Sequence, residues 1–315
     1  MSKVKVGVVQ ATPAFFDLSP TLKRVDHWLQ QAADQGCQLV LFPESFIPGY
    51  PRGFTFDSVI GRRSEEGRDL YARYWDNSVE VPGGACHQLA HMAKKYGVYL
   101  NIGVTERDAV NGTLYCTLLY FSPKVGLLGK HRKLKPTGIE RLVWGEGSSD
   151  SLISVQTAVG RLGGLICWEN YMPLARMAMY QAGVEIYLAP TADARERWTA
   201  TLQHIALEGR CFVLGCNQYF RKADYPEAYQ AYVTKEDEAL CRGGSIIIGP
   251  SGSIIAGPLY DQEGILTAEL DRSEIIRNKL DFDVVGHYSR NELFTYQVKD
   301  QPPIIRESDF PLLNE

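Results

Sequence analysis

Short apolar runs alternate with stretches of helical periodicity along most of the chain. Residues 3–10 alternate in the manner of a strand. Ser19 and Pro20 then suit the N-cap and first turn of a helix whose apolar residues recur every three or four positions. Gly36 is a suitable residue to end that helix. A second apolar run, residues 38–42, follows and predicts a buried strand.

The same alternation continues to about residue 270. Asn111-Gly112 lies between two strand-like runs and predicts a hairpin. Further strands are predicted at 98–104, 114–121, 152–156, 161–167, 185–190, 211–216, 244–249, 253–256 and 265–270. Further helices are predicted from Pro82 to Tyr96, from Pro173 onward and at 198–209. Because helices interleave with strands and no change of composition marks a linker, we predict one α/β domain whose sheets each carry helices on one face.

Two segments lack this periodicity. Residues 221–240 are polar and charged, with Lys235-Glu-Asp-Glu238 at their centre, and they are interpreted as a surface loop or insertion. The region from Asn278 onward has no strong period. We expect it to be an arm that packs on the body of the domain or on another subunit.

Composition excludes several classes of protein. The 315 residues are 45% hydrophobic and 22% charged, and the net charge of −4 gives no reason to expect nucleic acid or an anionic membrane as a partner. No apolar run approaches the ~18 residues that a membrane helix needs. The seven cysteines are scattered and form no CxxC pair, which favours a reducing, cytoplasmic compartment over a disulfide framework or a zinc site.

One cysteine lies where chemistry is expected. Cys167 comes at the end of the run 161–167, and Pro173 opens a helical pattern shortly afterwards. A strand, a sharp turn and a helix hold a nucleophile rigidly and direct backbone N–H groups towards it. The alternative is a buried structural cysteine, which is the common role of a free cysteine.

A carboxylate and a lysine accompany Cys167. Glu44 follows a fully apolar strand, where a carboxylate is costly unless it is paired or used, although a cap or turn role is the alternative. Lys133 lies in a basic run for which a solvated turn is the default interpretation. As a set, however, a thiol, a base and a fixed cation are what attack on a carbon–nitrogen bond requires.

Three segments that contain these residues resemble the signature segments of the nitrilase superfamily, in the same order. They are Phe42-Pro43-Glu44, Gly129-Lys-His-Arg-Lys-Leu-Lys-Pro-Thr137 and Ile166-Cys167-Trp168-Glu169-Asn170. Further matching segments are Gly49-Tyr-Pro-Arg-Gly-Phe54, Glu66-Gly-Arg-Asp69, Glu140-Arg-Leu-Val-Trp-Gly145, Pro190-Thr-Ala-Asp193, His204 to Val213 and Gly286-His-Tyr-Ser-Arg290. The resemblance covers nearly the whole chain and is strongest to plant nitrilases and their bacterial relatives.

The resemblance implies a fold and a set of roles. The fold would be a single-domain α/β, four-layer α-β-β-α sandwich. Residues 1–290 would form the carbon–nitrogen hydrolase domain and residues 291–315 a C-terminal arm at a subunit interface. The catalytic roles would fall to Cys167 as nucleophile, Glu44 as general base, Lys133 as stabilising cation and Glu140 as a second, positioning glutamate. The substrate pocket would be bordered by Trp168, Tyr50 and Thr191.

The resemblance also implies the reaction and its partners. Thiolate attack on a nitrile would give a thioimidate and then a thioester, without a metal or an organic cofactor. The partners would be a small nitrile and further copies of the chain, as a homodimer or a larger spiral. An amidase or carbamoylase with the same Glu44, Lys133 and Cys167 is the first alternative, and a non-catalytic scaffold is the second. Aliphatic nitriles, arylacetonitriles and cyanoalanine-like nitriles all remain open as substrates.

Overall fold

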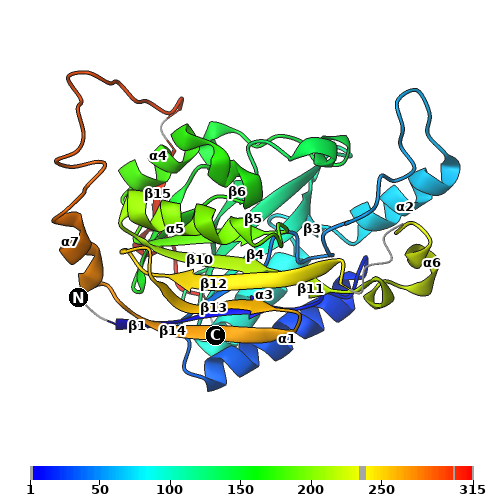
Figure 1. The fold of residues 1–315 in the computed structure, drawn as a ribbon. Helices are drawn as coiled ribbons and strands as arrows, with labels where there is room; N and C mark the ends of the chain where they lie inside the picture. Colours follow the sequence, from blue (N-terminus) through cyan, green and yellow to red (C-terminus); the bar gives the residue numbers. More distant parts are fainter. Residues whose placement is uncertain (1–2, 234–238, 301, 314–315) are drawn as a thin grey trace.

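Two mixed β-sheets pack face to face between outer layers of helices in the computed structural model, which describes residues 3–233, 239–300 and 302–313 (Figure 1). The first sheet has the order β14-β1-β2-β4-β5-β6, with β3 paired to β4. Its strands are β1 (Lys3–Gln10), β2 (Leu39–Leu41), β3 (Val79–Glu80), β4 (Tyr99–Arg107), β5 (Leu114–Ser122), β6 (Gly126–Arg132) and β14 (Gly264–Asp271). Strands β1, β2 and β4 are mutually parallel, so crossover connections join them.

The second sheet has the order β11-β12-β10-β9-β8-β7-β15, with β13 paired to β12. Its strands are β7 (Ser154–Thr157), β8 (Gly160–Gly164), β9 (Ile186–Thr191), β10 (Phe212–Asn217), β11 (Tyr219–Phe220), β12 (Cys241–Ile248), β13 (Ile254–Tyr260) and β15 (Ile304–Arg306). Strands β8, β9 and β10 form a parallel core. Each sheet therefore presents the carboxyl ends of neighbouring parallel strands at one edge, where α/β proteins build their sites.

Period-two alternation explains the layers. In β2, Leu39 and Leu41 belong to the core between the sheets, whereas Val40 belongs to the core between the first sheet and its helices. In β9, Ile186 and Leu188 face the first sheet in the same way. Both faces of these strands are buried, which is why the strands are continuous apolar runs.

Helices cover the two outer faces (Figure 1). Helices α1 (Leu18–Asp34) and α3 (Gly84–Tyr96) pack on the first sheet, and α4 (Pro173–Gln181) and α5 (Arg197–Gly209) pack on the second. The remaining helices are α2 (Glu65–Asp76), α6 (Glu227–Gln230), α7 (Ser273–Lys279) and the 3₁₀ turns η1 (Gly138–Leu142), η2 (Ser149–Ser151), η3 (Cys167–Tyr171), η4 (Lys222–Asp224) and η5 (Glu307–Asp309). The described helices include none that is long and apolar enough to cross a membrane.

Most predicted elements are confirmed, including the hairpin around Asn111-Gly112, since β4 and β5 pair antiparallel. Several boundaries are wrong. The first helix is capped by Asp17 and not by Ser19, and the helix expected from Pro82 begins at Gly84. The strand expected at 161–167 ends at Gly164, because the chain turns into η3. Helices α2 and α7 and strand β6 were not predicted.

The two aperiodic segments differ in structure. The segment expected to be a loop or insertion contains η4 and α6, and its residues 234–238 lie outside the described residues. The C-terminal arm returns to the body of the domain, because β15 adds a parallel strand beside β7. The Glu307 carboxylate then accepts hydrogen bonds from the Tyr99 and Ser122 hydroxyls of the first sheet.

Candidate active site

Four of the seven residues predicted from the sequence line one cavity, and the other three, Glu44, Lys133 and Thr191, are linked to them by hydrogen bonds. Glu44 follows β2, Lys133 follows β6, Cys167 follows β8 and Thr191 ends β9, so the positions come from strand ends in both sheets. Glu140 lies on η1, Tyr50 lies on the loop between β2 and α2, and Trp168 lies on η3 next to Cys167. The cavity has a volume of about 440 Å³, and its walls include Tyr50, Glu140, Cys167 and Trp168.

Lys133 is the centre of the charge arrangement. Its Nζ atom donates hydrogen bonds to Glu44 Oε1 and Glu140 Oε2, both at 2.7 Å, and its side chain is 0% exposed. Burial by itself lowers the pKa of this amine, but the neighbouring carboxylates, Glu44 first and then Glu140, raise the pKa of Lys133 well above its usual range. The lysine is therefore a buried, permanent cation with one N–H left for a further acceptor.

The solvated basic turn, which was the default interpretation of residues 129–136, is wrong for Lys133. Strand β6 continues the first sheet, and its alternation sends His131 and Lys133 inward. Lys130 and Arg132 point to the other face and pair with Glu106 at 2.5 and 2.6 Å. One basic run thus supplies two buried and two partly exposed side chains.

Cys167 occupies a strained turn directly after β8. Its φ is +52°, in the left-handed region that costs a residue with a Cβ atom roughly 1–2 kcal/mol. The turn is held by the amide of Asn170, which donates to the carbonyls of Leu165 and Cys167 at 2.9 and 2.8 Å. The Thr191 hydroxyl donates to Cys167 Sγ at 3.1 Å.

The thiol is protonated at rest. Burial, with the carboxylates of Glu44 and Glu140, raises the pKa of Cys167 to about 12, against the opposing effects of Lys133 and Thr191. A neutral thiol in such a site needs a base that takes its proton as it reacts.

Glu44 is placed to be that base. Its side chain is fully buried, Oε1 is bonded to Lys133, and Oε2 has no hydrogen-bond partner among the described residues. Burial raises the pKa of Glu44, Lys133 opposes the rise and Glu140 adds to it. Cys167 lies close enough to lower the same pKa, although no hydrogen bond of normal geometry joins the two groups. The Gln218 amide fixes the backbone by donating to Glu44 O at 2.7 Å.

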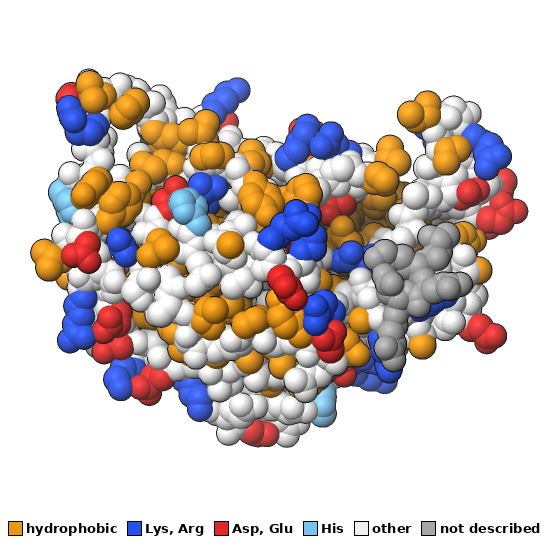
Figure 2. Space-filling model, viewed as in Figure 1, with side chains coloured by type: hydrophobic (Ala, Val, Ile, Leu, Met, Phe, Trp, Pro, Cys, Tyr) orange, Lys and Arg blue, Asp and Glu red, His pale blue; other side chains and the backbone are white. Residues whose placement is uncertain are grey.

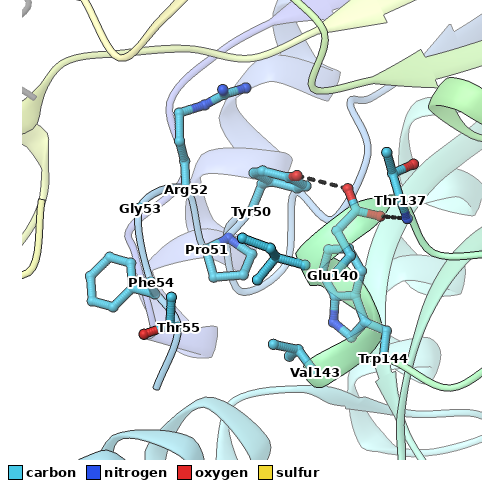
Figure 3. Close-up of a pocket in the computed structure, with 11 residues that line it drawn as sticks. Tyr50, Pro51, Arg52, Gly53, Phe54, Thr55, Thr137, Glu140, Val143 and Trp144 are labelled. Atoms are coloured by element: carbon cyan, nitrogen blue, oxygen red, sulfur yellow. Dashed lines mark hydrogen bonds between the residues drawn. The ribbon is translucent and has the colours of Figure 1, made fainter. Parts of the chain in front are cut away.

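Glu140 is held on both of its oxygens. Tyr50 donates its phenol O–H to Oε1 at 2.7 Å, and the backbone N–H of Thr137 donates to Oε2 at 2.6 Å (Figure 3). Burial and the nearby carboxylates raise the pKa of Tyr50 well above its usual range, so this phenol stays a donor. With Lys133 also bound to Oε2, the glutamate is fixed in a single orientation.

Trp168 lies at the mouth of the cavity and is 39% exposed. Its indole N–H donates to Asp193 Oδ2 at 2.9 Å, and the Arg195 guanidinium lies 4.9 Å from the centre of its ring. These contacts give the cavity an aromatic wall of fixed orientation. A second cavity of about 480 Å³ shares Tyr50, Arg52, Thr137 and Glu140 with it as lining residues.

Sequence reasoning missed Glu169, the second residue after Cys167. This buried carboxylate accepts from the backbone N–H of Ile166 at 2.7 Å and from that of Leu134 at 2.5 Å. It also faces His131 Nε2 at 3.0 Å, while His131 Nδ1 lies 2.9 Å from the carbonyl of Ser151. The residue before the thiol and the residue after the lysine are therefore tied to one side chain. The signal that could have identified it is a glutamate beside the candidate nucleophile in an otherwise apolar stretch.

Comparisons with known proteins agree with this geometry. The family model described as carbon-nitrogen hydrolase matches residues 5–279. The chain is 51% identical over 303 residues to an aliphatic nitrilase of Sinorhizobium fredii, covering 96% of this chain and 97% of that protein. It is 50% identical over 305 residues to a bifunctional nitrilase/nitrile hydratase of Lupinus angustifolius, covering 95% of this chain and 87% of that protein.

Solved structures share the fold. A carbon-nitrogen hydrolase from Helicobacter pylori superposes with a TM-score of 0.73 at 19% identity, over 95% of this chain and 98% of that chain. The Saccharomyces cerevisiae Nit3 protein, a member of the nitrilase superfamily, gives a TM-score of 0.72 at 22% identity, over 91% of this chain and 97% of that chain. The sandwich, the buried Glu-Lys-Cys constellation and the match over most of the sequence have one explanation. The chain belongs to the carbon-nitrogen hydrolase family.

Proposed function

We propose that this carbon-nitrogen hydrolase is a nitrilase, which converts an organic nitrile to the carboxylic acid and ammonia. The observation that carries the proposal is the buried constellation of Cys167, Lys133 and Glu44, with the Lys133 ammonium 2.7 Å from the carboxylate of Glu44. Attack on a carbon–nitrogen triple bond needs a nucleophile, a base and a fixed cation. The high identity to an aliphatic nitrilase supports the choice of nitriles over amides.

The first half of the reaction forms a thioimidate. Cys167 Sγ attacks the nitrile carbon, and the thiol proton passes to Glu44 as the carbon–sulfur bond forms. Glu44 then delivers this proton to the nitrile nitrogen, while Lys133 stabilises the negative charge that develops on it, and the neutral thioimidate results. The raised pKa of Cys167 means that the thiol loses its proton only as it attacks. The raised pKa of Glu44 makes this carboxylate able to accept the proton and to return it.

The second half releases the products. One water adds to the thioimidate carbon, and its two protons pass to the nitrogen by way of Glu44. The carbon–nitrogen bond then breaks, which releases ammonia and leaves a thioester. A second water hydrolyses the thioester to the acid and restores the thiol. Glu140, held by Tyr50, positions substrate or water in these steps, and Trp168 and Thr191 border the substrate.

The test is ammonia release from a panel of nitriles, each measured beside its matching amide. Release from nitriles with little release from amides is the expected result, and the ratio of acid to amide product is read from the same reactions. Release from amides alone would assign the protein to the amidase branch. Release from neither substrate class would contradict the proposal.

The variant Cys167→Ala isolates the nucleophile. We expect loss of turnover by at least about 10³-fold with only a small change in the thermal midpoint, because the thiol forms the covalent intermediate and alanine removes a single side-chain atom. Residual activity close to that of the parent protein would contradict a covalent mechanism.

We also propose a cytoplasmic homo-oligomer. All seven cysteines are unpaired, as in proteins of reducing compartments. Large hydrophobic side chains are exposed along η3, α4 and α5, among them Tyr171, Leu174 (70% exposed) and Leu207. Figure 2 shows hydrophobic side chains gathered on the face that carries these helices. Residues 291–315 form the arm of the domain and are proposed to contribute to such an interface.

A further inference from the structure

The cavity that contains Cys167 is lined by more cationic than anionic side chains. Three arginines, Arg52, Arg195 and Arg242, share its walls with two carboxylates, those of Glu140 and Asp193. A nitrile group carries no charge and does not require this arrangement. Whether each arginine is paired with a carboxylate therefore indicates which further chemical group of a substrate the cavity binds.

Two of the three arginines are neutralised by neighbouring carboxylates. Arg195 donates to Asp193 Oδ1 through its Nε at 2.7 Å and through its backbone N–H at 3.1 Å. Arg242 pairs with Asp261 at 2.8 Å and lies 3.6 Å from Glu196. Neither guanidinium carries an uncompensated charge.

Arg52 differs from both. Within the described part of the chain it forms no ion pair with a carboxylate, and its Nε is buried without a hydrogen-bond partner. One terminal N–H donates to the backbone carbonyl of Ala192, and the guanidinium lies 5.5 Å from the centre of the Tyr50 ring. Figure 3 shows Tyr50 between Arg52 and Glu140. The oxygens of Glu140 and Asp193 accept hydrogen bonds from other donors, and neither carboxylate forms an ion pair with Arg52.

The arginine is held rigidly relative to the nucleophile. Its backbone carbonyl accepts from the Tyr225 phenol at 3.1 Å, and its backbone N–H donates to the carbonyl of Tyr50 at 2.8 Å. Ala192, to which the guanidinium donates, follows Thr191, whose hydroxyl is 3.1 Å from Cys167 Sγ. A guanidinium that is partly buried, fixed in place and without a counter-ion among the described residues is a preorganised receptor for an anion, and its planar fork matches a carboxylate.

We propose that Arg52 binds the carboxylate of the substrate, and that the preferred substrates are short aliphatic nitriles that carry a carboxylate at the other end. The inference rests on the proposed nitrilase function and adds the chemical class of the substrate. Cys167 attacks the nitrile carbon while Arg52 holds the far end of the molecule, so the charge selects the substrate and orients it.

The test compares kcat/KM for matched substrates. 3-Cyanopropanoate and 4-cyanobutanoate are each measured beside the hydroxynitrile of the same carbon number, and the ratio of anionic to neutral substrate is recorded. The parent protein should favour the anionic member by about 10-fold or more, and Arg52→Gln should lower the ratio by about 10- to 100-fold, since a charge-assisted hydrogen bond is lost. Arg52→Lys should retain part of the preference, because the charge remains and the fork is lost.

Arg242→Gln is the matched control, since it removes a guanidinium from the same cavity that Asp261 already neutralises. Its ratio should stay within about twofold of the parent value. Equal losses on anionic and neutral nitriles in Arg52→Gln would assign Arg52 a structural role and overturn the proposal, as would a parent protein without preference.

A binding measurement separates this proposal from the proposed function. In the Cys167→Ala background, 4-cyanobutanoate is titrated by calorimetry with and without Arg52→Gln. Binding that weakens by about 10-fold or more on loss of Arg52 supports the carboxylate site even if no nitrile is turned over. Equal binding by both proteins, or binding by neither, would overturn the proposal whether or not the protein hydrolyses neutral nitriles.

Discussion

A single ammonium shared between two carboxylates governs the site at the scale of residues. Lys133 is 2.7 Å from an oxygen of Glu44 and from an oxygen of Glu140, and all three groups are largely buried. In such a cluster each charge sets the pKa of its neighbours, so a change at one residue appears in the titration of another.

The variant Glu140→Gln tests this coupling. Glu44 must be ionised to accept the thiol proton, so kcat/KM falls as pH falls through the pKa of Glu44, which lies above 4.5. The Glu140 carboxylate is one of the groups that raise this pKa, and its removal should therefore move the acid limb of the pH profile to lower pH. Activity should also fall, on the order of 10²-fold, because the substrate loses a positioning group.

The measurement is the pH dependence of kcat/KM for the residual activity. Glu146→Gln is the control, since Glu146 is exposed and pairs with Lys135 at the surface. An acid limb that stays in place or moves to higher pH in Glu140→Gln would show that Glu140 does not act on the base.

At the scale of elements, close packing of strand β4 against the loop after β2 places Glu44. A Cβ atom at Gly103 would lie 2.2 Å from the carbonyl oxygen of Pro43 and 2.7 Å from the Cα of Glu44. A glycine is therefore needed at position 103 because the backbone of β4 approaches the backbone of the loop after β2 too closely for a side chain, and not because of its own dihedral angles.

The variant Gly103→Ala should displace Glu44 and lower activity more than its loss of stability suggests. We expect destabilisation of about 1–3 kcal/mol from overpacking and a loss of kcat of at least about 10-fold. Gly112→Ala is the control, because nothing lies within 4 Å of an added Cβ there. Denaturant unfolding and nitrile turnover check both variants, and a fully active Gly103→Ala protein would contradict the argument.

The turn η3 and the end of strand β6 are joined by Glu169. Glu169→Gln replaces one acceptor oxygen by an amide N–H, which would face a backbone donor at Ile166 or Leu134 and leave His131 without its carboxylate. Breaking a buried pair of this kind costs about 3–5 kcal/mol. We expect kcat to fall as well, because the pair of Glu169 and His131 fixes the position of Cys167 relative to Lys133.

The loss of stability in Glu169→Gln should depend on pH in a definite direction. Burial lowers the pKa of His131, but Glu169 raises it, and the net pKa lies above 6.5. The stability that the pair contributes is thus complete below pH 6.5 and is lost as pH rises through the folded-state pKa. The difference in unfolding free energy between the parent protein and Glu169→Gln should therefore narrow as pH rises, down to the pH-independent part that comes from the backbone donors of Ile166 and Leu134. A constant or widening difference would contradict a charged histidine.

At the scale of the whole molecule, the exposed side chains of α4 distinguish a monomer from an assembly. Leu174→Glu places a charge where a leucine is 70% exposed, and in the proposed oligomer that charge would be buried unpaired. We expect a smaller particle by size-exclusion chromatography with light scattering. Val110→Glu, at the 93% exposed tip of the β4–β5 hairpin, should leave the particle mass unchanged. Equal masses for Leu174→Glu and the parent protein would exclude α4 from the interface.

Much of the fold could be predicted from periodicity. The strand ending near Leu41, the helix from Pro173 and the hairpin at Asn111-Gly112 all form as expected, because each depends on nearest neighbours and on burial of a whole segment. Strand β6 was missed because its polar sequence contains no alternation of apolar residues. The buried face of this strand carries His131, and Lys133 follows its last residue. Burial of these two side chains is possible only because carboxylates on other elements pair with them.

The sequence by itself determined the order of most strands and helices, since this order depends on local pattern, and it predicted Cys167, Glu44 and Lys133 as a set from their motifs. Only the tertiary structure decided which polar groups are paired. Lys133 is buried between two carboxylates, and Glu169 joins the turn of Cys167 to the end of the strand before Lys133. Arg52 faces the cavity and forms no ion pair with a carboxylate of the described residues. The physical reason is that the state of a charge depends on its solvent exposure and its neighbours, and strands distant in the chain supply both.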